Sequence, residues 1–328
     1  MAIKIFRSSS LAFPKASFSI SKTFHSKSRS SFSSQAEAAT THFGAETVKE
    51  TEKAKLVAGV FDKVAISYDD MNDLMSAGLH RVWKDEFVRM AGPLASDMHY
   101  RDRGFEHPNQ QNQQQSNPLP IVLLDVAGGT GDIAFRLIDS LSSSPVREPP
   151  PGVAPPTVIV CDINSNMLAV GEARSRKRGL AQNDGSTVQK PTMMWKRGDA
   201  EKLDFLENES VDLYTIAFGI RNVTRIDRAL KEAHRVLRPG GRFMCLEFSR
   251  VVNPLLAHAY DLYSTNIIPT MGQIVANDRA SYQYLVDSIR RFPDQETFAD
   301  MIEEAGFKHV KYKNLSLGVC AVHSGFKW

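Results

Sequence analysis

Beyond residue 120 the chain alternates short apolar runs with amphipathic stretches. Runs of aliphatic and β-branched residues predict five strands, at Ile121–Asp125, Val158–Asp162, Met193–Arg197, Val211–Phe218 and Arg242–Phe248. Helical periodicity lies between them at 131–141, 165–179 and 226–237, and a later helix is predicted over 294–305. Strands that are apolar throughout and alternate with helices indicate a parallel sheet covered on both faces.

Two further features complete this α/β plan. The runs Phe307–Tyr312 and Gly318–His323 are expected to pair as an antiparallel edge, which gives a Rossmann-like sheet of seven mostly parallel strands. Residues 250–291 are largely apolar and fall between the fifth strand and the last helix, so we interpret them as a helical lid insertion over the active site. Five of its side chains either line a substrate tunnel or pack as core or as a subunit interface: Tyr260, Tyr263, Ile267, Ile268 and Met271.

The first 36 residues differ in composition from the rest. They contain six Lys or Arg and no Asp or Glu, and they are rich in Ser without a continuous apolar core. This composition predicts an organelle transit peptide over residues 1–36 rather than a secretory signal. The stretch Arg29–Ser34 resembles a plant mitochondrial processing site. The spacing of the basic residues favours a mitochondrion over a chloroplast, and a tail without a targeting role is the remaining alternative.

Between this segment and the sheet, residues 37–59 are predicted to be a flexible, partly helical lead-in. The main domain is expected over 60–328 and opens on a helical region from Val60 to Met90. Three polar stretches rich in Gln, Ser or Pro interrupt it at 97–118, 142–156 and 182–191. They have little to bury, so we expect surface loops there.

Charge and cysteine content exclude several classes of protein. The whole chain has a formal net charge of +3, but without the first 36 residues the balance is 34 basic against 37 acidic residues, or −3. The body therefore has no overall attraction for nucleic acid. No stretch approaches the roughly 20 apolar residues of a membrane span, so we expect membrane contact to be peripheral. Three cysteines without a CxxC spacing predict buried small side chains rather than a metal site or disulfides.

A glycine-rich turn follows the first predicted strand. Gly128, Gly129 and Gly131 allow the backbone to approach a ligand closely, and the helix that follows offers free N–H groups to an anion such as a cofactor carboxylate. Asp162 ends the second strand, where a carboxylate accepts hydrogen bonds from both ribose hydroxyls of a nucleotide cofactor. Nicotinamide enzymes share both features. The alternative for Asp162 is a structural N-cap of the next helix.

Two later motifs distinguish among cofactors. Asp199, in Gly198-Asp199-Ala200 after the third strand, is placed to accept from an adenine amino group. The turn Leu237–Gly241 before the fifth strand is typical of methyltransferases and not of nicotinamide folds. The four motifs in this order predict a class I methyltransferase that uses S-adenosyl-L-methionine. Methyl transfer from a sulfonium requires no metal, and we predict none.

Beyond these motifs the chain resembles the ubiquinone/menaquinone C-methyltransferase family. The matching segments are Val64–Lys84, the glycine-rich turn, Phe218–Thr224 and Ser281–Pro293, and the resemblance extends over about residues 60–328. One departure is Ala217, which stands where bacterial relatives use a cofactor-binding Ser, so that contact is not carried over. With Gly128 of the turn, the cofactor contacts that the resemblance implies are Thr130, Asp162, Asp199 and Ala200.

The resemblance also implies a reaction and a setting. The reaction is methylation of a ring carbon of 2-methoxy-6-polyprenyl-1,4-benzoquinol in ubiquinone biosynthesis. The setting is the matrix side of the mitochondrial inner membrane, with peripheral membrane contact. Other ubiquinone-biosynthesis proteins are expected as partners in a multi-subunit complex, nucleic acid is not, and a homodimer is left open.

Arg221 and Asn222 are the catalytic residues that we expect. A phenol with an ordinary pKa of about 10 must lose its proton to activate the ring carbon. We expect Arg221 to stabilise the phenolate and Asn222 to orient the ring or a bridging water. The alternative for Arg221 is a structural ion pair with Asp227 or Glu232.

The route of the proton is open at this point. A guanidinium stays protonated, so Arg221 is a poor base and the proton passes to water or to a nearby His, Tyr or Asp. His258 and His323 are considered as proton carriers beside ordinary structural roles. Tyr68 and the stretch 67–72 are expected either to fold over the cofactor or to pack as a helix.

Three other functions compete with this interpretation. The first is the same chemistry on a demethylmenaquinone or phylloquinone precursor in a chloroplast. The second is a catalytically silent subunit of a quinone-synthesis complex, against which the intact cofactor motifs argue. The third is a nucleic-acid methylase, which the acidic body and the lack of an Asn-Pro-Pro-Tyr motif disfavour.

Overall fold

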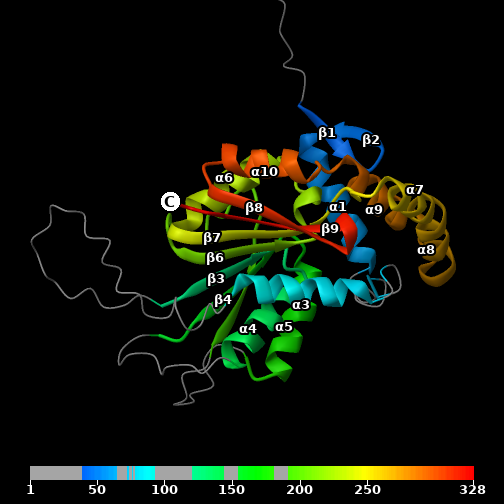
Figure 1. Ribbon diagram of the computed structural model, residues 1–328. Coiled ribbons are helices and arrows are strands. Elements are labelled where there is room, and N and C mark those ends of the chain that lie inside the picture. The colour runs from blue at the N-terminus through cyan, green and yellow to red at the C-terminus, as the bar shows by residue number, and fades with distance from the viewer. Residues whose placement is uncertain are drawn as a thin grey trace, which may run out of the picture. The chain divides into compact units, whose positions relative to one another are not determined.

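The computed structural model describes residues 39–64, 72–73, 76, 78–92, 120–143, 154–180 and 191–328. Their centre is a seven-stranded sheet in the order β5-β4-β3-β6-β7-β9-β8 (Figure 1). Neighbours from β5 to β7 are parallel, and β9 is antiparallel to both β7 and β8. The predicted mostly parallel sheet with an antiparallel pair at one edge is confirmed. The strands are β3 Val122–Val126, β4 Thr157–Asp162, β5 Thr192–Arg197, β6 Val211–Ala217, β7 Leu237–Phe248, β8 Lys308–Leu315 and β9 Cys320–Phe326.

Strand β7 begins earlier than the sequence predicts, at Leu237 instead of Arg242. The N–H of Gly240 donates to the carbonyl of Lys327 at 2.7 Å, and the N–H of Lys327 donates to the carbonyl of Gly241 at 3.0 Å. Gly240 has a φ of 80° in this stretch. The predicted tight turn is therefore an irregular start of the strand that pairs with the end of the chain.

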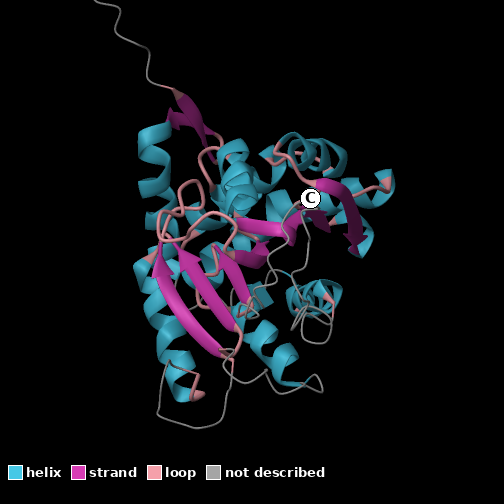
Figure 2. Ribbon diagram, turned by 90° about the vertical axis from the view of Figure 1, so that its left-hand side faces the viewer, coloured by secondary structure: helices cyan, strands magenta, loops and turns pink. Residues whose placement is uncertain are grey.

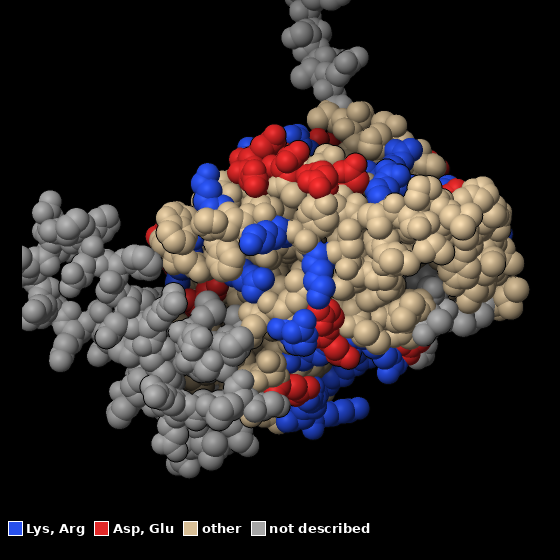
Figure 3. Space-filling view, viewed as in Figure 1, with Lys and Arg blue, Asp and Glu red and all other residues tan. Residues whose placement is uncertain are grey.

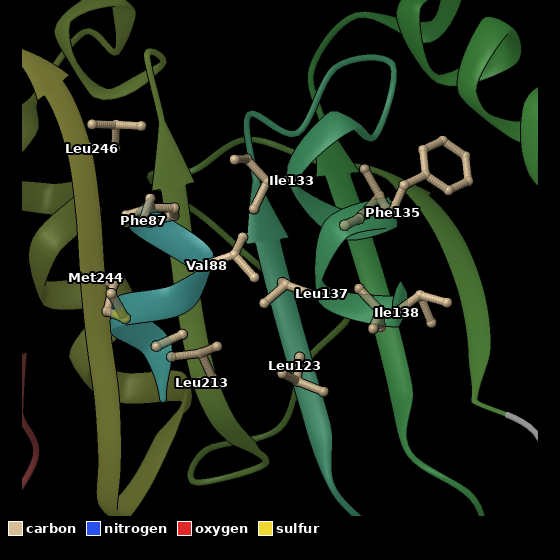
Figure 4. Close-up of a cluster of buried hydrophobic side chains, with 14 of the residues drawn as sticks. Phe87, Val88, Leu123, Ile133, Phe135, Leu137, Ile138, Leu213, Met244 and Leu246 are labelled. Carbon is tan, nitrogen blue, oxygen red and sulfur yellow. The ribbon is translucent and has the colours of Figure 1, made fainter. Parts of the chain in front are cut away.

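Helices cover both faces of the sheet (Figure 2). One face carries α3 (Leu79–Ala91), α4 (Asp132–Ser143) and α5 (Ser165–Lys177), and the other carries α6 (Ile226–Val236) and α10 (Gln295–Glu304). Successive residues of β3 point to opposite faces, since Leu123 belongs to the first core cluster and Leu124 to the second. Figure 4 shows the first cluster, where α3 and α4 pack on the strands.

The segment before α3 corrects one prediction. From residue 39 onward, the lead-in contains an antiparallel hairpin of β1 (Thr40–Phe43) and β2 (Glu46–Lys49) around Gly44 where flexible chain was expected. Its predicted helical part is confirmed by α1 (Glu50–Val64), which follows at once. Lys53 of α1 donates to the carbonyl of Val223 at 2.8 Å, and the ring of Phe43 stacks on Tyr284 at 4.5 Å. These contacts with distant parts of the chain hold the segment in place.

The insertion between β7 and α10 is helical, as predicted. It consists of α7 (Pro254–Leu262), a π-helical turn η2 (Tyr263–Ile267), α8 (Ile268–Ala276) and α9 (Arg279–Arg291). In the space-filling view of Figure 3, the surface over α7 and α8 carries few charged side chains.

Several predictions concern other parts of the chain. The transit peptide, Tyr68 and nearly all of the three polar stretches lie outside the described residues. Within the described ranges, no helix is long and apolar enough to cross a membrane. All three cysteines are free and buried, as expected.

Candidate active site

A cleft opens where the strand order reverses, at the carboxyl ends of β3, β4 and β6. Parallel sheets of this kind bind ligands at this edge. All of the predicted cofactor residues come together in its wall, although they follow three different strands: Gly128, Thr130, Asp162, Asp199 and Ala200. We call this space the cofactor cleft.

The glycine-rich turn is shaped by close packing. A Cβ atom on Gly128 would stand 2.7 Å from both Asp125 Oδ2 and Val160 Cγ1, so a side chain does not fit there. Gly129 and Gly131 have φ values of 53° and 84°, in the left-handed region that favours glycine. The N–H of Gly131 closes the turn on the carbonyl of Gly128 at 2.8 Å. The turn therefore offers a bare backbone to a ligand in the cleft.

Asp162 is held by the backbone on both oxygens. Its Oδ2 accepts from the N–H of Gly129 and its Oδ1 from the N–H of Asn164, each at 2.8 Å. The N-cap of α5 is Asn164, whose side chain accepts from the N–H groups of Asn166 and Met167, so the N-cap alternative for Asp162 is wrong. Burial raises the pKa of Asp162, whereas these backbone hydrogen bonds oppose that shift. The carboxylate is thus fixed at the strand end, facing a ligand.

Helix α1 forms a wall of the cofactor cleft that the sequence analysis missed. Ala54, Val57, Ala58 and Phe61 line it from one side of the helix. Their spacing of three, one and three residues is the pattern of an amphipathic helix. That pattern was the available signal within a segment interpreted as flexible.

A second cavity of about 440 Å³ adjoins the cofactor cleft. The two share Phe61, Lys84 and Phe218 in their walls. The Lys84 ammonium donates to Asp132 Oδ2 at 2.7 Å and so joins α3 to α4 at this boundary. Aromatic side chains dominate the second cavity: Phe61, Trp83, Phe218, Phe248, Tyr260, Tyr263, Tyr282 and Tyr284. We call it the aromatic cavity.

Arg221 lines the aromatic cavity and is buried in an ion pair. Its Nη1 donates to Glu247 Oε1 at 2.7 Å and to the carbonyl of Phe218 at 2.6 Å. The partners considered from sequence are both wrong, because Asp227 pairs with Arg225 and Glu232 with Arg235. Glu247 reaches Arg221 because parallel pairing sets the end of β7 beside the end of β6.

Asn222 lies on the other side of this boundary. It lines the cofactor cleft, and its Oδ1 accepts from the hydroxyl of Tyr284 at 2.9 Å. Tyr284 in turn lines the aromatic cavity. Arg221 and Asn222 are adjacent in sequence but line two neighbouring cavities. The hydrogen bond between Tyr284 and Asn222 links the walls of these two cavities.

The other predicted side chains are divided among the cavity wall, the interior and the surface. Tyr260, Tyr263 and Ile268 line the aromatic cavity, whereas Ile267 and Met271 are not in its wall. Neither histidine considered as a proton carrier faces a cavity. His258 is exposed on α7, and His323 is buried with its Nε2 2.9 Å from the carbonyl of Gln295. Burial lowers the pKa of His323 to about 4. The described residues contain no cluster of His, Cys, Asp or Glu suited to a metal ion.

The sequence matches the model of the ubiE/COQ5 methyltransferase family over residues 46–327. The chain belongs to this family. It is a methyltransferase, and S-adenosyl-L-methionine is its cofactor. The bare turn at Gly128 and the fixed carboxylate of Asp162 fit the carboxylate and the ribose of that cofactor.

Curated relatives match nearly the whole methyltransferase. A mitochondrial 2-methoxy-6-polyprenyl-1,4-benzoquinol methylase of Arabidopsis thaliana is 50% identical, over 88% of this chain and 90% of its own length. A protein of the same name from Dictyostelium discoideum is 48% identical over 88% and 86%. The ubiquinone/menaquinone biosynthesis C-methyltransferase UbiE of Dinoroseobacter shibae is 52% identical over 88% and 97%. Among solved structures, a methyltransferase from Thermotoga maritima is 19% identical with a TM-score of 0.47, over 82% and 99%.

Proposed function

We propose that the protein methylates a ring carbon of 2-methoxy-6-polyprenyl-1,4-benzoquinol in ubiquinone biosynthesis. The observation that supports this most directly is the pair of adjoining cavities, one suited to the cofactor and one lined by aromatic rings. The names of relatives about half identical to this chain support the same substrate. In this proposal the aromatic cavity holds the quinol, and bound S-adenosyl-L-methionine supplies the methyl group.

Within this proposal Arg221 and Asn222 have separate tasks. Arg221 contributes positive charge to the aromatic cavity. Burial raises the pKa of the phenols of Tyr260 and Tyr284, and the charge of Arg221 opposes that rise, although Glu247 acts against Arg221 at Tyr284. A phenolate of the substrate gains from the same field. Asn222 accepts a hydrogen bond from the Tyr284 hydroxyl and thereby positions the wall of the aromatic cavity relative to the cofactor cleft. Gly128, Thr130, Asp162, Asp199 and Ala200 contact the cofactor.

The test is a transfer assay with S-adenosyl-L-methionine labelled in its methyl group. The acceptors are a reduced 2-methoxybenzoquinol with a short prenyl tail and a demethylmenaquinol with the same tail. The proposal expects label on the benzoquinol, and less label with the Asp162→Ala variant when S-adenosyl-L-methionine is limiting. Label on the naphthoquinol alone would favour the menaquinone-type reaction. Calorimetric titration that detects no binding of S-adenosyl-L-methionine would favour a silent subunit.

We extend the proposal to the mitochondrial matrix as the location. The relatives from Arabidopsis and Dictyostelium carry mitochondrial names, and residues 1–36 are basic and free of acid. Fusion of residues 1–36 to a fluorescent reporter is expected to direct it into mitochondria. A matched fusion with all six Lys and Arg replaced by Gln is expected to stay outside. Import of the reporter into chloroplasts would overturn the assignment.

The proposed peripheral contact with the inner membrane is supported by the insertion. Residues 251–277 contain a single charged residue, Asp261. Aliphatic side chains of α7 and α8 and their flanks face solvent, with Leu255 81% and Ile274 78% exposed (Figure 3). The same helices contribute walls to the aromatic cavity, and arginines at 250, 279 and 290 flank them. A bilayer suits this surface, because it offers both apolar contact and anionic headgroups.

Sedimentation with vesicles of phosphatidylcholine and cardiolipin tests this contact. The double variant Leu255→Ser/Ile274→Ser is expected to bind vesicles more weakly than the native protein. Val82→Ser is the matched control, since Val82 is 61% exposed on α3. If the double variant instead changes a dimer to a monomer in analytical ultracentrifugation and vesicle binding is unchanged, the face is a subunit interface.

A further inference from the structure

Phenols in the aromatic cavity are difficult to ionise. Burial raises the pKa of Tyr284 to about 12, although the charge of Arg221 opposes this shift. A quinol hydroxyl in the same cavity meets the same loss of solvent, which disfavours its anion. The field of Arg221 is therefore insufficient by itself. Formation of a phenolate needs a group in the cavity wall that takes the proton.

The cavity wall contains few groups able to do this. Among the described residues that line it there is no Asp or Glu. Two cations line it, Arg221 and Lys84, and they already donate to Glu247 and Asp132, respectively. Its tyrosines are phenols like the substrate and have no advantage as acceptors. The remaining titratable side chain of known placement is His80.

His80 is oriented by a carboxylate. It is the second residue of α3, its side chain is buried, and its Nε2 lies 2.7 Å from Asp73 Oδ1. Gly78, with a φ of 77°, turns the chain between them and donates its N–H to the carbonyl of Asp73 at 2.9 Å. The other ring nitrogen, Nδ1, is buried and has no hydrogen-bond partner among the described residues. The His80 side chain lines the aromatic cavity, so a quinol hydroxyl that reaches this nitrogen would supply the missing partner.

Burial favours the neutral form of this imidazole, which is the form that accepts a proton. Burial lowers the pKa of His80 below its ordinary 6.5, Lys84 acts in the same direction, and Asp73 and Asp132 oppose both. Hydrogen bonds from Arg81 and His80 lower the pKa of Asp73 to about 2, so Asp73 remains a carboxylate near neutral pH. A carboxylate at Nε2 fixes the proton there and leaves the Nδ1 lone pair available.

We propose that His80, held by Asp73, is the proton acceptor for the quinol hydroxyl in this reaction. The O–H bond of the quinol breaks, its proton moves to Nδ1 of His80, and its electron pair stays on the oxygen. The phenolate raises electron density at the neighbouring ring carbon, where the new carbon–carbon bond forms. The bond between that methyl group and the sulfonium sulfur of S-adenosyl-L-methionine breaks as it does so, and its electron pair stays on the sulfur. That carbon then loses its own hydrogen to solvent as a proton, and His80 returns its proton to the oxygen. One proton in total is released, and the aromatic ring is restored.

This inference depends on the proposed substrate class. Its test begins with the native protein and the short-tailed methoxybenzoquinol, so that absence of any transfer there counts against the proposed function alone. The decisive variant is His80→Ala, which removes the acceptor and leaves space for a small base. We expect its kcat to fall by roughly 100-fold or more. Added imidazole is expected to restore part of the rate, and more basic methylimidazoles are expected to restore more of it.

A structural role for His80 would not produce this rescue. The kcat of the native protein is expected to fall in acid as His80 is protonated below pH 6.5. In His80→Ala with imidazole, the fall is expected at the pKa of the added base instead. His258→Ala is the matched control, because His258 is exposed and outside the cavity wall, and its pH profile should be that of the native protein. Asp73→Asn should lower kcat while changing KM little.

A second readout does not depend on turnover. In protein labelled with ¹⁵N-histidine, the Nδ1 resonance of His80 is assigned as the one absent from His80→Ala. It is expected to move when the quinol is added together with S-adenosylhomocysteine. An unmoved resonance, a kcat within twofold of native in His80→Ala, or an imidazole-independent loss of rate would overturn the proposal.

Discussion

The cofactor cleft and the aromatic cavity share a boundary but are built differently. The cleft is made by turns that directly follow strands together with one wall from helix α1, and its key contacts are to the backbone, as at Gly128 and Asp162. The aromatic cavity is made largely by side chains from helices before the sheet and from the insertion between β7 and α10, and one of its two cations, Arg221, pairs with Glu247 of β7. In the proposed function, the cofactor would thus bind mainly to the common fold and the substrate mainly to added elements.

The largest effects are expected from replacing Arg221 in the aromatic cavity, on the free energy of unfolding and on methyl transfer. Arg221→Ala leaves Glu247 buried without its guanidinium, so we expect unfolding to require about 3–5 kcal/mol less, and methyl transfer to be lost. Affinity for S-adenosylhomocysteine should change little in the folded protein. Urea unfolding and calorimetric titration measure the two quantities.

The double variant Arg221→Met/Glu247→Gln is the control for that prediction. It removes both charges and keeps an acceptor for the N–H of Phe248, which donates to Glu247 at 2.9 Å. We expect it to recover most of the lost stability without recovering turnover. Full turnover in the double variant would show that Arg221 is structural only.

The next effect concerns a buried acid beneath the cofactor cleft. Burial raises the pKa of Asp125 from 3.8 to about 7, although Thr215 donates to it at 2.8 Å. Between pH 4 and pH 7, Asp125 is protonated in the folded protein but ionised in the unfolded chain. The contribution of Asp125 to the free energy of unfolding is therefore full below pH 4 and declines as pH rises to 7. The decline amounts to about 4 kcal/mol.

Asp125→Asn cannot ionise and should remove this decline. Calorimetric melting of the native protein and the variant, followed from pH 4 to pH 8, gives the difference. We expect the variant to gain relative stability steadily up to pH 7 and no further above it. A constant difference across this range would mean that Asp125 does not titrate there.

Asp162→Ala tests the cofactor side of the comparison. The substitution removes the carboxylate that accepts from the N–H groups of Gly129 and Asn164. In the proposed function it also removes the contact with the cofactor ribose. A hydrogen bond to a charged group contributes about 1.5–3 kcal/mol, so the affinity for S-adenosylhomocysteine should fall by roughly 10- to 150-fold. Affinity for a quinone analogue should be nearly native, and an equal loss of both would contradict the separation of the two cavities.

The smallest effect is expected at the bond between the cavities. Tyr284→Phe removes one hydrogen bond to Asn222, which is worth about 1 kcal/mol. We expect KM for the quinol to rise about fivefold, with cofactor affinity nearly unchanged. Tyr312→Phe is a suitable control, because its hydroxyl bonds to the exposed Glu296 outside both cavities. An equal rise in both variants would show that the Asn222 contact has no specific role.

Local signals account for the parts of the structure that the sequence predicted. The seven strands and the turns that line the cofactor cleft follow from apolar runs and from turns a few residues long, because neighbours along the chain form them. The hairpin at Thr40–Lys49 was missed because Phe43 is held by Tyr284, far away in sequence. The π-helical turn at Tyr263 likewise has no local signal.

The sequence alone determined the sheet, the cofactor cleft and the family, because the spacing of glycine and aspartate after successive strands is a property of short segments. Only the tertiary structure decided the partner of Arg221 and the histidine in the cavity wall. Glu247 follows Arg221 by 26 residues and becomes its neighbour through strand pairing. His80 became a candidate base because it is buried in the wall of a cavity that distant segments of the chain complete, and such burial cannot be inferred from the residues beside it.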